Sequence, residues 1–383
     1  MDFELSEDQR LLVDSVQSFV KKDSPIERMR RLRDHEVGWE KSTWKQMAEL
    51  GWLGVLFPES VGGSQLSFVE VGLIIEQLGT TLVPEPITAL VTAGVPLWKL
   101  GNAEQHERYL SPALGGDTSL ALAYLERDGR FDARQIATRA EKTASGYRLS
   151  GSKRWVQNGH AADHLVVSAR TSGGPGDSDG VSLFLLDAGQ PGLRRTTVKQ
   201  MDGKKSAMLE LEGVEVGAER LLGEPGAALP ALELALDYGA AATCTEGAGV
   251  MQTVLMMTRN YLTERRQFGV PIGSFQALQH RAVDMFVETE LAKSTAILAM
   301  LDVEAEDAAV RQRSISIAKA QLAESGGFVV RQGTQLHGGI GVTDEHDVGL
   351  YFKRMHVLST LFGDAHFHTR RFASLPSFTR NVA

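Results

Sequence analysis

The stretch YLTERRQFGVPIGSFQALQHRAVDM, residues 261–285, joins two long amphipathic segments. Segments of this kind cover residues 227–263, 275–303 and 308–338, and they are longer than most helices of globular proteins. Helices of such length bury their apolar faces by packing against one another. The sequence therefore predicts a bundle of long antiparallel helices after Gly226.

The spacing of apolar residues changes twice between the start of the chain and Gly226. Residues 5–50 show helical spacing of apolar side chains, with Ser6 as a plausible N-cap, and this spacing resumes in the segment SFVEVGLIIEQLGTT and around residues 86–112. From about Thr118, short apolar or alternating runs such as VSLFLLDA are separated by Gly, Asp and Ser, which is typical of strands. The stretch TSGGPGDSDG, residues 171–180, reads as a solvated hairpin tip.

These patterns predict an α+β protein with three domains. We expect an N-terminal α-helical domain at residues 1–117, a middle β-barrel or β-sandwich domain at residues 118–225, and a C-terminal four-helix bundle at residues 226–383. A chain of 383 residues exceeds the usual size of one domain, in agreement with this division.

Composition excludes several classes of function. The net charge of −8 and a pI near 5.7 argue against nucleic acid as a partner, because phosphate binding needs a surplus of Lys and Arg. No run approaches about 18 consecutive apolar residues, so we expect no membrane span. Cys244 is the single cysteine, which forbids an internal disulfide, and the first residues do not resemble a signal peptide. A cytoplasmic protein is the expectation.

Five segments, in order along the chain, resemble the acyl-CoA dehydrogenase family. The start LSEDQRLL, the strand region SGSKRWVQNGHAADHLVV and the strand LEGVEVGAERLLGE match the first half of its pattern. Residues 261–285 resemble the segment "R..FG..I..FQ", and RQGTQLHGGIGVTDEHDVGLYFKR, residues 331–354, resembles "Q..GG.G" and the helix that follows. The resemblance covers essentially the whole chain and implies FAD as cofactor.

The residue types agree with a flavin dinucleotide. A guanidinium offers planar donors to a diphosphate, and glycines let backbone N–H groups come close to phosphate or ribose. The resemblance places an aromatic at Trp155, against the isoalloxazine, and Phe268 against the adenine. The cofactor-binding residues that it implies are Trp155, Gln157, Arg265, Phe268, Gln276, Gln335, Gly338 and Gly339.

The family is a tetramer in which each FAD spans two subunits. By that likeness, we expect Arg265 and Phe268 to serve one FAD, and Gln335, Gly338 and Gly339 to serve the FAD of the neighbouring subunit. A homotetramer and an α2β2 heterotetramer with a second acyl-CoA dehydrogenase subunit both remain open.

The substrate side departs from the family pattern. The family's catalytic Glu aligns with Phe362 in LSTLFGDAHFHTRRFA, and Asp364 follows two residues later. The alternative position of a branched-chain subset falls on Gly239, beside Asp237 and Tyr238, with Glu246 about two turns further on. The standard Glu is therefore expected to be absent. Asp364 is the candidate base, and its alternative roles are a helix N-cap or a salt bridge with Arg370 or Arg371. Asp237 and Tyr238 are the expected substrate-side residues.

The loop LERDGRFD, residues 125–132, departs from the family pattern as well. It stands where the family has "TEP.aGSD", whose Thr contacts the flavin and whose Ser lies near the thioester. Leu125 replaces that Thr, and Phe131 replaces that Ser. The part that faces the substrate is therefore altered more than the part that binds FAD.

Three functions stay open. The first is FAD-dependent α,β-dehydrogenation of an acyl-CoA thioester in lipid catabolism, with electrons passed to an electron-transfer flavoprotein. The second is a catalytically silent subunit that supplies half of a shared FAD site, and the third is a flavin oxidase or monooxygenase. A metal site at His356, His366 and His368 is not expected, because histidines two residues apart on a helix face different directions.

Overall fold

The computed structural model describes residues 4–376. The chain forms two compact units, each assembled from separate stretches of sequence. We call Met1–Arg33, Ser67–Val83 and Ala240–Ala383 the helical unit, and Asp34–Leu66 and Pro84–Gly239 the sheet unit. Helix α8 (Leu229–Glu264) continues from the sheet unit into the helical unit.

The sheet unit contains one mixed sheet. Its strands are β1 (Leu120–Ala123), β2 (Arg139–Lys142), β3 (Gly146–Gln157), β4 (His164–Arg170), β5 (Val181–Asp187), β6 (Leu193–Lys199), β7 (Lys205–Gly217) and β8 (Leu221–Leu222). The order across the sheet is β6-β7-β3-β2-β4-β5-β8, and β1 pairs parallel to β4.

The sheet is open, so the predicted barrel is wrong. Closure would need pairing between β6 and β8, which do not pair in the described chain. β8 has only two residues, and β6 is a partly exposed edge strand that carries Arg194, Arg195 and Lys199. Charged side chains on a short or exposed edge oppose further pairing.

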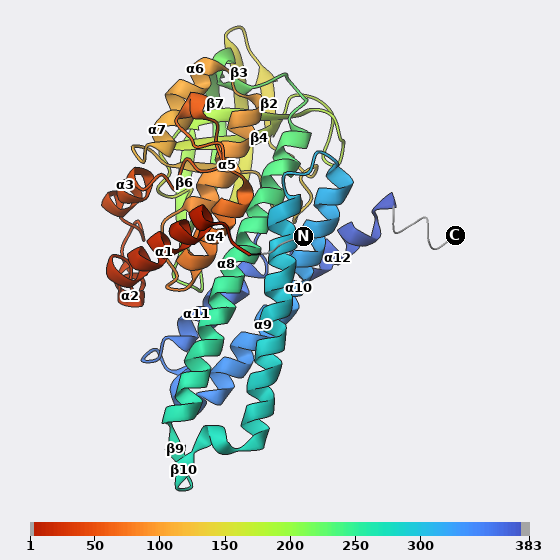
Figure 1. Ribbon diagram of the computed structural model, residues 1–383. Helices are drawn as coiled ribbons and strands as arrows, with labels where there is room; N and C mark the ends of the chain where they lie inside the picture. Colours follow the sequence, from red (N-terminus) through yellow and green to blue (C-terminus); the bar gives the residue numbers. More distant parts are fainter. Residues whose placement is uncertain (1–3, 377–383) are drawn as a thin grey trace. The chain divides into compact units, whose positions relative to one another are not determined.

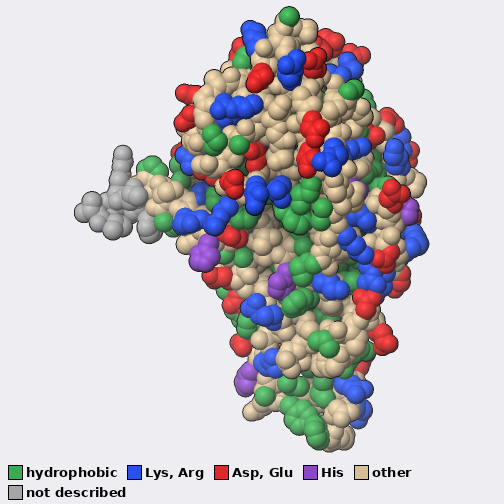
Figure 2. Space-filling view, turned by 180° about the vertical axis from the view of Figure 1, so that it is seen from behind, with side chains coloured by type: hydrophobic (Ala, Val, Ile, Leu, Met, Phe, Trp, Pro, Cys, Tyr) green, Lys and Arg blue, Asp and Glu red, His purple; other side chains and the backbone are tan. Residues whose placement is uncertain are grey.

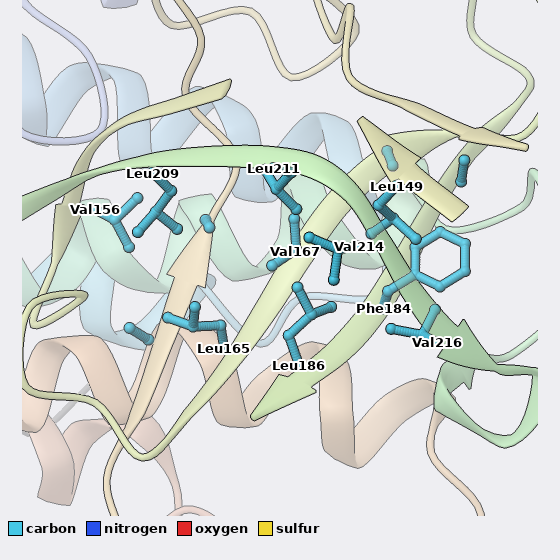
Figure 3. Close-up of a cluster of buried hydrophobic side chains, with 14 of the residues drawn as sticks. Leu149, Val156, Leu165, Val167, Phe184, Leu186, Leu209, Leu211, Val214 and Val216 are labelled. Atoms are coloured by element: carbon cyan, nitrogen blue, oxygen red, sulfur yellow. The ribbon is translucent and has the colours of Figure 1, made fainter. Parts of the chain in front are cut away.

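The core of this sheet comes from alternating apolar positions. Leu149 and Val156 of β3 and Leu209 and Leu211 of β7 point to one buried cluster (Figure 3). β5 is buried along six of its seven residues, as expected for a strand covered on both faces. The short helical elements of this unit are α3 (Lys41–Glu49), η1 (Glu59–Val61), α5 (Ile87–Leu100), α6 (Ala103–Gln105), η2 (His106–Leu110), α7 (Ser111–Leu114) and η3 (Ala218–Arg220), of which α5 packs on β1.

The helical unit is built on three long helices, which run side by side in Figure 1: the second part of α8, α9 (Gln276–Asp302) and α10 (Ala308–Leu336). A Cβ on Gly333 of α10 would lie 2.5 Å from Cγ1 of Val254 on α8, so glycine lets these two helices approach closely. The other elements are α1 (Glu7–Lys22), α2 (Ile26–Leu32), α4 (Phe68–Gly79), β9 (Arg266–Gln267), β10 (Val270–Pro271), η4 (Ile272–Ser274), η5 (Gly338–Val342), α11 (Val348–Leu358) and α12 (Ala365–Ala373).

The predicted helix–sheet–helix order and fold class are confirmed. Ser6 caps α1 as expected, in a capping box with Gln9. No helix of residues 4–376 is long and apolar enough to cross a membrane.

Candidate functional site

A cavity of about 620 Å³ lies in the helical unit, where α8 ends and α10 ends. Arg265 follows α8, Arg281 belongs to α9, and Gln335 belongs to the last turn of α10. Gly338 and Gly339, which begin η5, complete this side of the cavity. Residues far apart in the sequence therefore meet around one space.

The glycine-rich turn forms the C-terminal cap of α10. His337 caps the helix, and Gly338 adopts a left-handed φ of +65°, the usual way to close a helix C-terminus. A Cβ built on Gly338 or Gly339 would meet no atom within 4 Å. The space beside their backbone is open to a bound group rather than filled by the protein.

The polar lining suits an anion. Arg265, Arg281 and Gln335 line the cavity, and no carboxylate belongs to its described lining. Nε of Arg281 donates to Oε1 of Gln332 at 2.7 Å, which orients the guanidinium. Two cations beside accessible glycine N–H groups are the donor set that a diphosphate requires.

His337 forms the buried wall of this cavity. Its Nδ1 lies 2.7 Å from the carbonyl of Gly333, so Nδ1 carries the hydrogen, and Nε2 has no partner in the described part of the chain. Its ring lies 4.6 Å from that of Tyr261 and 4.4 Å from that of His346, centroid to centroid. Burial lowers the pKa of His337, so the ring is neutral near pH 7.

Residues that the sequence assigned to two different FAD molecules line one cavity of a single chain. Arg265 lines the same cavity as Gln335, Gly338 and Gly339. Phe268 is not among the lining residues: it occupies the two-residue turn of the β9–β10 hairpin with a φ of 56°, and 90% of it is exposed. Gln276, the first residue of α9, is exposed and also lies outside the lining.

Trp155 and Gln157 belong to the sheet unit, at the end of β3. A β-bulge between Lys153 and Val156 gives Trp155 a φ of 52° and leaves its side chain 47% exposed. A large aromatic held in a left-handed conformation on an exposed strand end is uncommon and is often associated with a site.

A buried ion pair anchors the altered loop beside this strand. Nζ of Lys153 donates to Oε1 of Glu126 at 2.6 Å and to Oγ of Ser168 at 2.9 Å. Glu126 also accepts from the hydroxyl of Thr138 and from the backbone of Ala137. Burial lowers the pKa of Lys153 to about 8, although Glu126 opposes that shift. This network joins the start of the loop at residues 125–132 to β3.

Asp364 lies in the connection between α11 and α12. Its Oδ1 accepts from the backbone N–H of Phe367 at 2.8 Å, so it is the N-cap of α12. Oδ2 has no hydrogen-bond partner among residues 4–376. Phe362, which we aligned with the family's Glu from the sequence, is buried with a φ of 57°.

The other carboxylates considered from the sequence are buried. Asp237 and Tyr238 are 1% and 3% exposed, so neither faces an open surface of the sheet unit. Glu246 forms a buried ion pair with Arg354, a residue that the sequence did not single out. No group of His, Cys, Asp and Glu side chains in the described chain is suited to hold a metal ion.

Sequence reasoning also missed Arg281 and His337. Arg281 is one of several cations on the long helices, and only the packing of α9 against α10 brings it to the cavity. His337 could have been found, because it directly precedes the two glycines.

The helix–sheet–helix order is the three-domain fold of a flavoprotein oxidoreductase. Three family models match in sequence order: the acyl-CoA dehydrogenase N-terminal domain at residues 6–117, its middle domain at 121–214 and its C-terminal domain at 229–374. The chain belongs to the acyl-CoA dehydrogenase family.

Individual relatives span nearly the whole chain. Acyl-CoA dehydrogenase FadE27 of Mycobacterium tuberculosis is 30% identical over 362 residues, 92% of each chain. A chain in the structure of the electron transferring flavoprotein of Acidaminococcus fermentans has a TM-score of 0.90 at 29% identity, covering 97% of this chain and 98% of that one. A chain of the ChsE4–ChsE5 complex of Mycobacterium tuberculosis has a TM-score of 0.87 at 29% identity, with the same coverage.

Proposed function

We propose that this protein binds FAD with its diphosphate in the cavity of the helical unit and takes part in α,β-dehydrogenation of an acyl-CoA thioester. The single observation that carries the proposal is the meeting of Arg265, Arg281 and the Gly338–Gly339 turn around one cavity without a carboxylate. Two guanidinium groups offset the two negative charges of a diphosphate, and open space beside both glycines leaves room for its oxygens.

When bound, the flavin supplies the acceptor for the hydride that leaves the β-carbon. The exposed indole of Trp155 offers an apolar surface to the isoalloxazine, and Gln157 offers an amide for a hydrogen bond. Gln335 orients the adenosine half of the cofactor. In this proposal Phe268 and Gln276, which lie outside the cavity of their own chain, serve the FAD of a neighbouring subunit.

Removal of the α-proton requires a base, and in this proposal Phe362 stands in place of the family's Glu. Asp364 is the candidate, because one of its carboxylate oxygens caps α12 and the other is free to accept a proton. Asp237 is buried, and both carboxylate oxygens of Glu246 are bound to Arg354. These two carboxylates are therefore poorer candidates.

The second candidate function is a silent subunit that contributes part of an FAD site to a heteromeric enzyme. It is favoured by the helix-capping role of Asp364 and by the buried Phe362 at the Glu position. The relative in the ChsE4–ChsE5 complex supports a heteromeric assembly. A flavin oxidase or monooxygenase remains a third candidate on the same fold.

An exposed apolar face supports assembly into a tetramer, homomeric or α2β2. Val283, Phe286, Val287 and Leu291 on α9 are each at least 47% exposed, at spacings that place them on one side of the helix. Hydrophobic side chains also gather at the end of the helical unit that carries β9 and β10 (Figure 2). We propose an electron-transfer flavoprotein as the electron acceptor and the cytoplasm as the location.

The visible spectrum of the purified protein and anaerobic mixing with butyryl-CoA test these functions. A yellow protein whose flavin bleaches on mixing supports the dehydrogenase. A yellow protein that bleaches only after a second acyl-CoA dehydrogenase subunit is added supports the silent subunit. Rapid oxygen consumption with butyryl-CoA in air supports the oxidase. A protein that binds no added FAD, alone or with such a subunit, contradicts the proposal.

A further inference from the structure

A buried lysine donates a hydrogen bond to the last carbonyl of α11, where the connection to α12 begins. Lys319 of α10 is completely buried, and its Nζ donates to the carbonyl oxygen of Leu358, the last residue of α11, at 2.7 Å. The last carbonyls of a helix have no partner within the helix, and they carry partial negative charge. A buried cation at this point fixes where the connection starts.

A buried histidine holds the other half of the connection. His368 of α12 is 1% exposed, and its Nε2 lies 3.0 Å from the carbonyl oxygen of Phe362. Because a carbonyl only accepts, Nε2 carries the hydrogen. His368 lies one helical turn after Asp364, so this hydrogen bond links α12 to the backbone turn that precedes the helix.

The backbone between these two contacts is strained. Phe362 has a φ of 57° and Gly363 a φ of 120°. A Cβ at position 363 would lie 2.5 Å from Nε2 of His368, so only glycine permits this contact. Such conformations persist where surrounding contacts outweigh their cost, and here Lys319 and His368 supply those contacts.

Lys319 is also the buried cation that acts on Asp364. Asp364 makes no ion pair within 4.0 Å among the described residues, but its charge favours the ammonium of Lys319, as an ionised Cys244 would. Burial nevertheless lowers the pKa of Lys319 to about 8. Burial raises the pKa of the Cys244 thiol to about 12, so this group is neutral and Asp364 is the carboxylate that Lys319 senses.

We infer that Lys319 and His368 are positioning residues: they fix the turn from Leu358 to Asp364 and thereby place the carboxylate of Asp364 for proton removal. The inference rests on the proposed function only for the role of Asp364. The anchoring of the turn stands on the two hydrogen bonds and can be tested without activity.

Hydrogen exchange of the full-length protein tests the anchoring. In Lys319→Met, amides of residues 359–364 should exchange roughly tenfold to a hundredfold faster, because the variant loses a charge-assisted hydrogen bond to the carbonyl of Leu358. Lys153→Met is the matched control: Lys153 is equally buried but belongs to the sheet unit, so residues 359–364 should keep their wild-type rates. Unchanged exchange in Lys319→Met overturns the inference.

His368 gives a second, independent pair of variants, which decides the question if Lys319→Met does not fold. His368→Leu should speed exchange in the same segment, whereas His368→Gln keeps a donor for the carbonyl of Phe362 and should restore slow exchange. Equal exchange in His368→Leu and wild type would contradict the role of this side chain.

Anaerobic flavin bleaching by butyryl-CoA tests whether the turn positions a catalytic group. In Lys319→Met the rate constant at saturating butyryl-CoA should fall about tenfold, while the half-saturating concentration stays within about twofold. Faster exchange with an unchanged bleaching rate would overturn the catalytic part of the inference. Faster exchange in a protein whose wild type never bleaches would instead refute the proposed dehydrogenase and leave the anchoring intact.

Discussion

Arg354 and Glu246 form a bidentate ion pair in the interior of the helical unit. Nε of Arg354 lies 2.6 Å from Oε1 of Glu246, and the second terminal nitrogen lies 2.7 Å from Oε2. The two residues are 4% and 6% exposed. This ion pair therefore joins α8 and α11 within the helical unit.

Removing one partner of this pair should destabilise the protein strongly. Arg354→Met leaves the Glu246 carboxylate buried without its cation, which costs about 3–5 kcal/mol. Urea denaturation of wild type, Arg354→Met, Glu246→Gln and the double variant measures this. The double variant should be less destabilised than the sum of the single ones, and strict additivity would show that the pair is not coupled.

The lining of the cavity predicts that Arg265 contributes to FAD affinity and that its neighbour Arg266 does not. Arg265 lines the cavity, whereas the exposed Arg266 of β9 does not. Loss of one charge-assisted hydrogen bond weakens binding by roughly tenfold to a hundredfold. Arg265→Gln should therefore lose FAD during purification or titration, while Arg266→Gln keeps the wild-type flavin-to-protein ratio. Equal flavin content in both variants would place the diphosphate elsewhere.

The two glycines of the turn should respond differently to alanine. Gly338 has a left-handed φ, so Gly338→Ala should cost about 1–2 kcal/mol of stability even without FAD. Gly339 has no positive φ and open space beside it, so Gly339→Ala should leave the stability of the FAD-free protein unchanged. Its methyl group projects into open space at the cavity, so FAD affinity should fall. Thermal melts and FAD titrations separate the effects on stability and affinity, and a loss of stability in Gly339→Ala would argue against this geometry.

Local sequence signals predicted the elements well. The Ser6 cap, the helix from Lys41 and the hairpin tip at residues 171–180 depend on neighbours in sequence, and the structure contains all three. The barrel failed because closure depends on whether distant edge strands pair, which β6 and β8 do not. Arg265 and Gln335 were predicted one by one, but their meeting in one chain depends on the packing of the long helices.

Buried lysines should make stability rise with pH in the weakly alkaline range. Burial lowers the pKa of Lys319 from its usual value near 10.5 to about 8, so the folded protein releases this proton while the unfolded chain still holds it. Stability is therefore lowest below pH 8 and increases toward pH 10.5, by about 1 kcal/mol between pH 8 and 9 for this residue.

Lys153 behaves in the same way, because burial lowers its pKa to about 8 as well. The raised pKa of Cys244 acts in the opposite direction once the thiol of the unfolded chain begins to ionise, between pH 8 and 9, and dominates the change above pH 9, which restricts the useful range to pH 7–9. Urea unfolding across this range should show a slope that is reduced by about half in Lys319→Met. The exposed Lys142 gives the control, since Lys142→Met should retain the full slope. If Lys319→Met leaves the slope unchanged, Lys319 keeps its proton across this pH range in the folded protein. The ammonium would then be stabilised by more than its hydrogen bond to the carbonyl of Leu358.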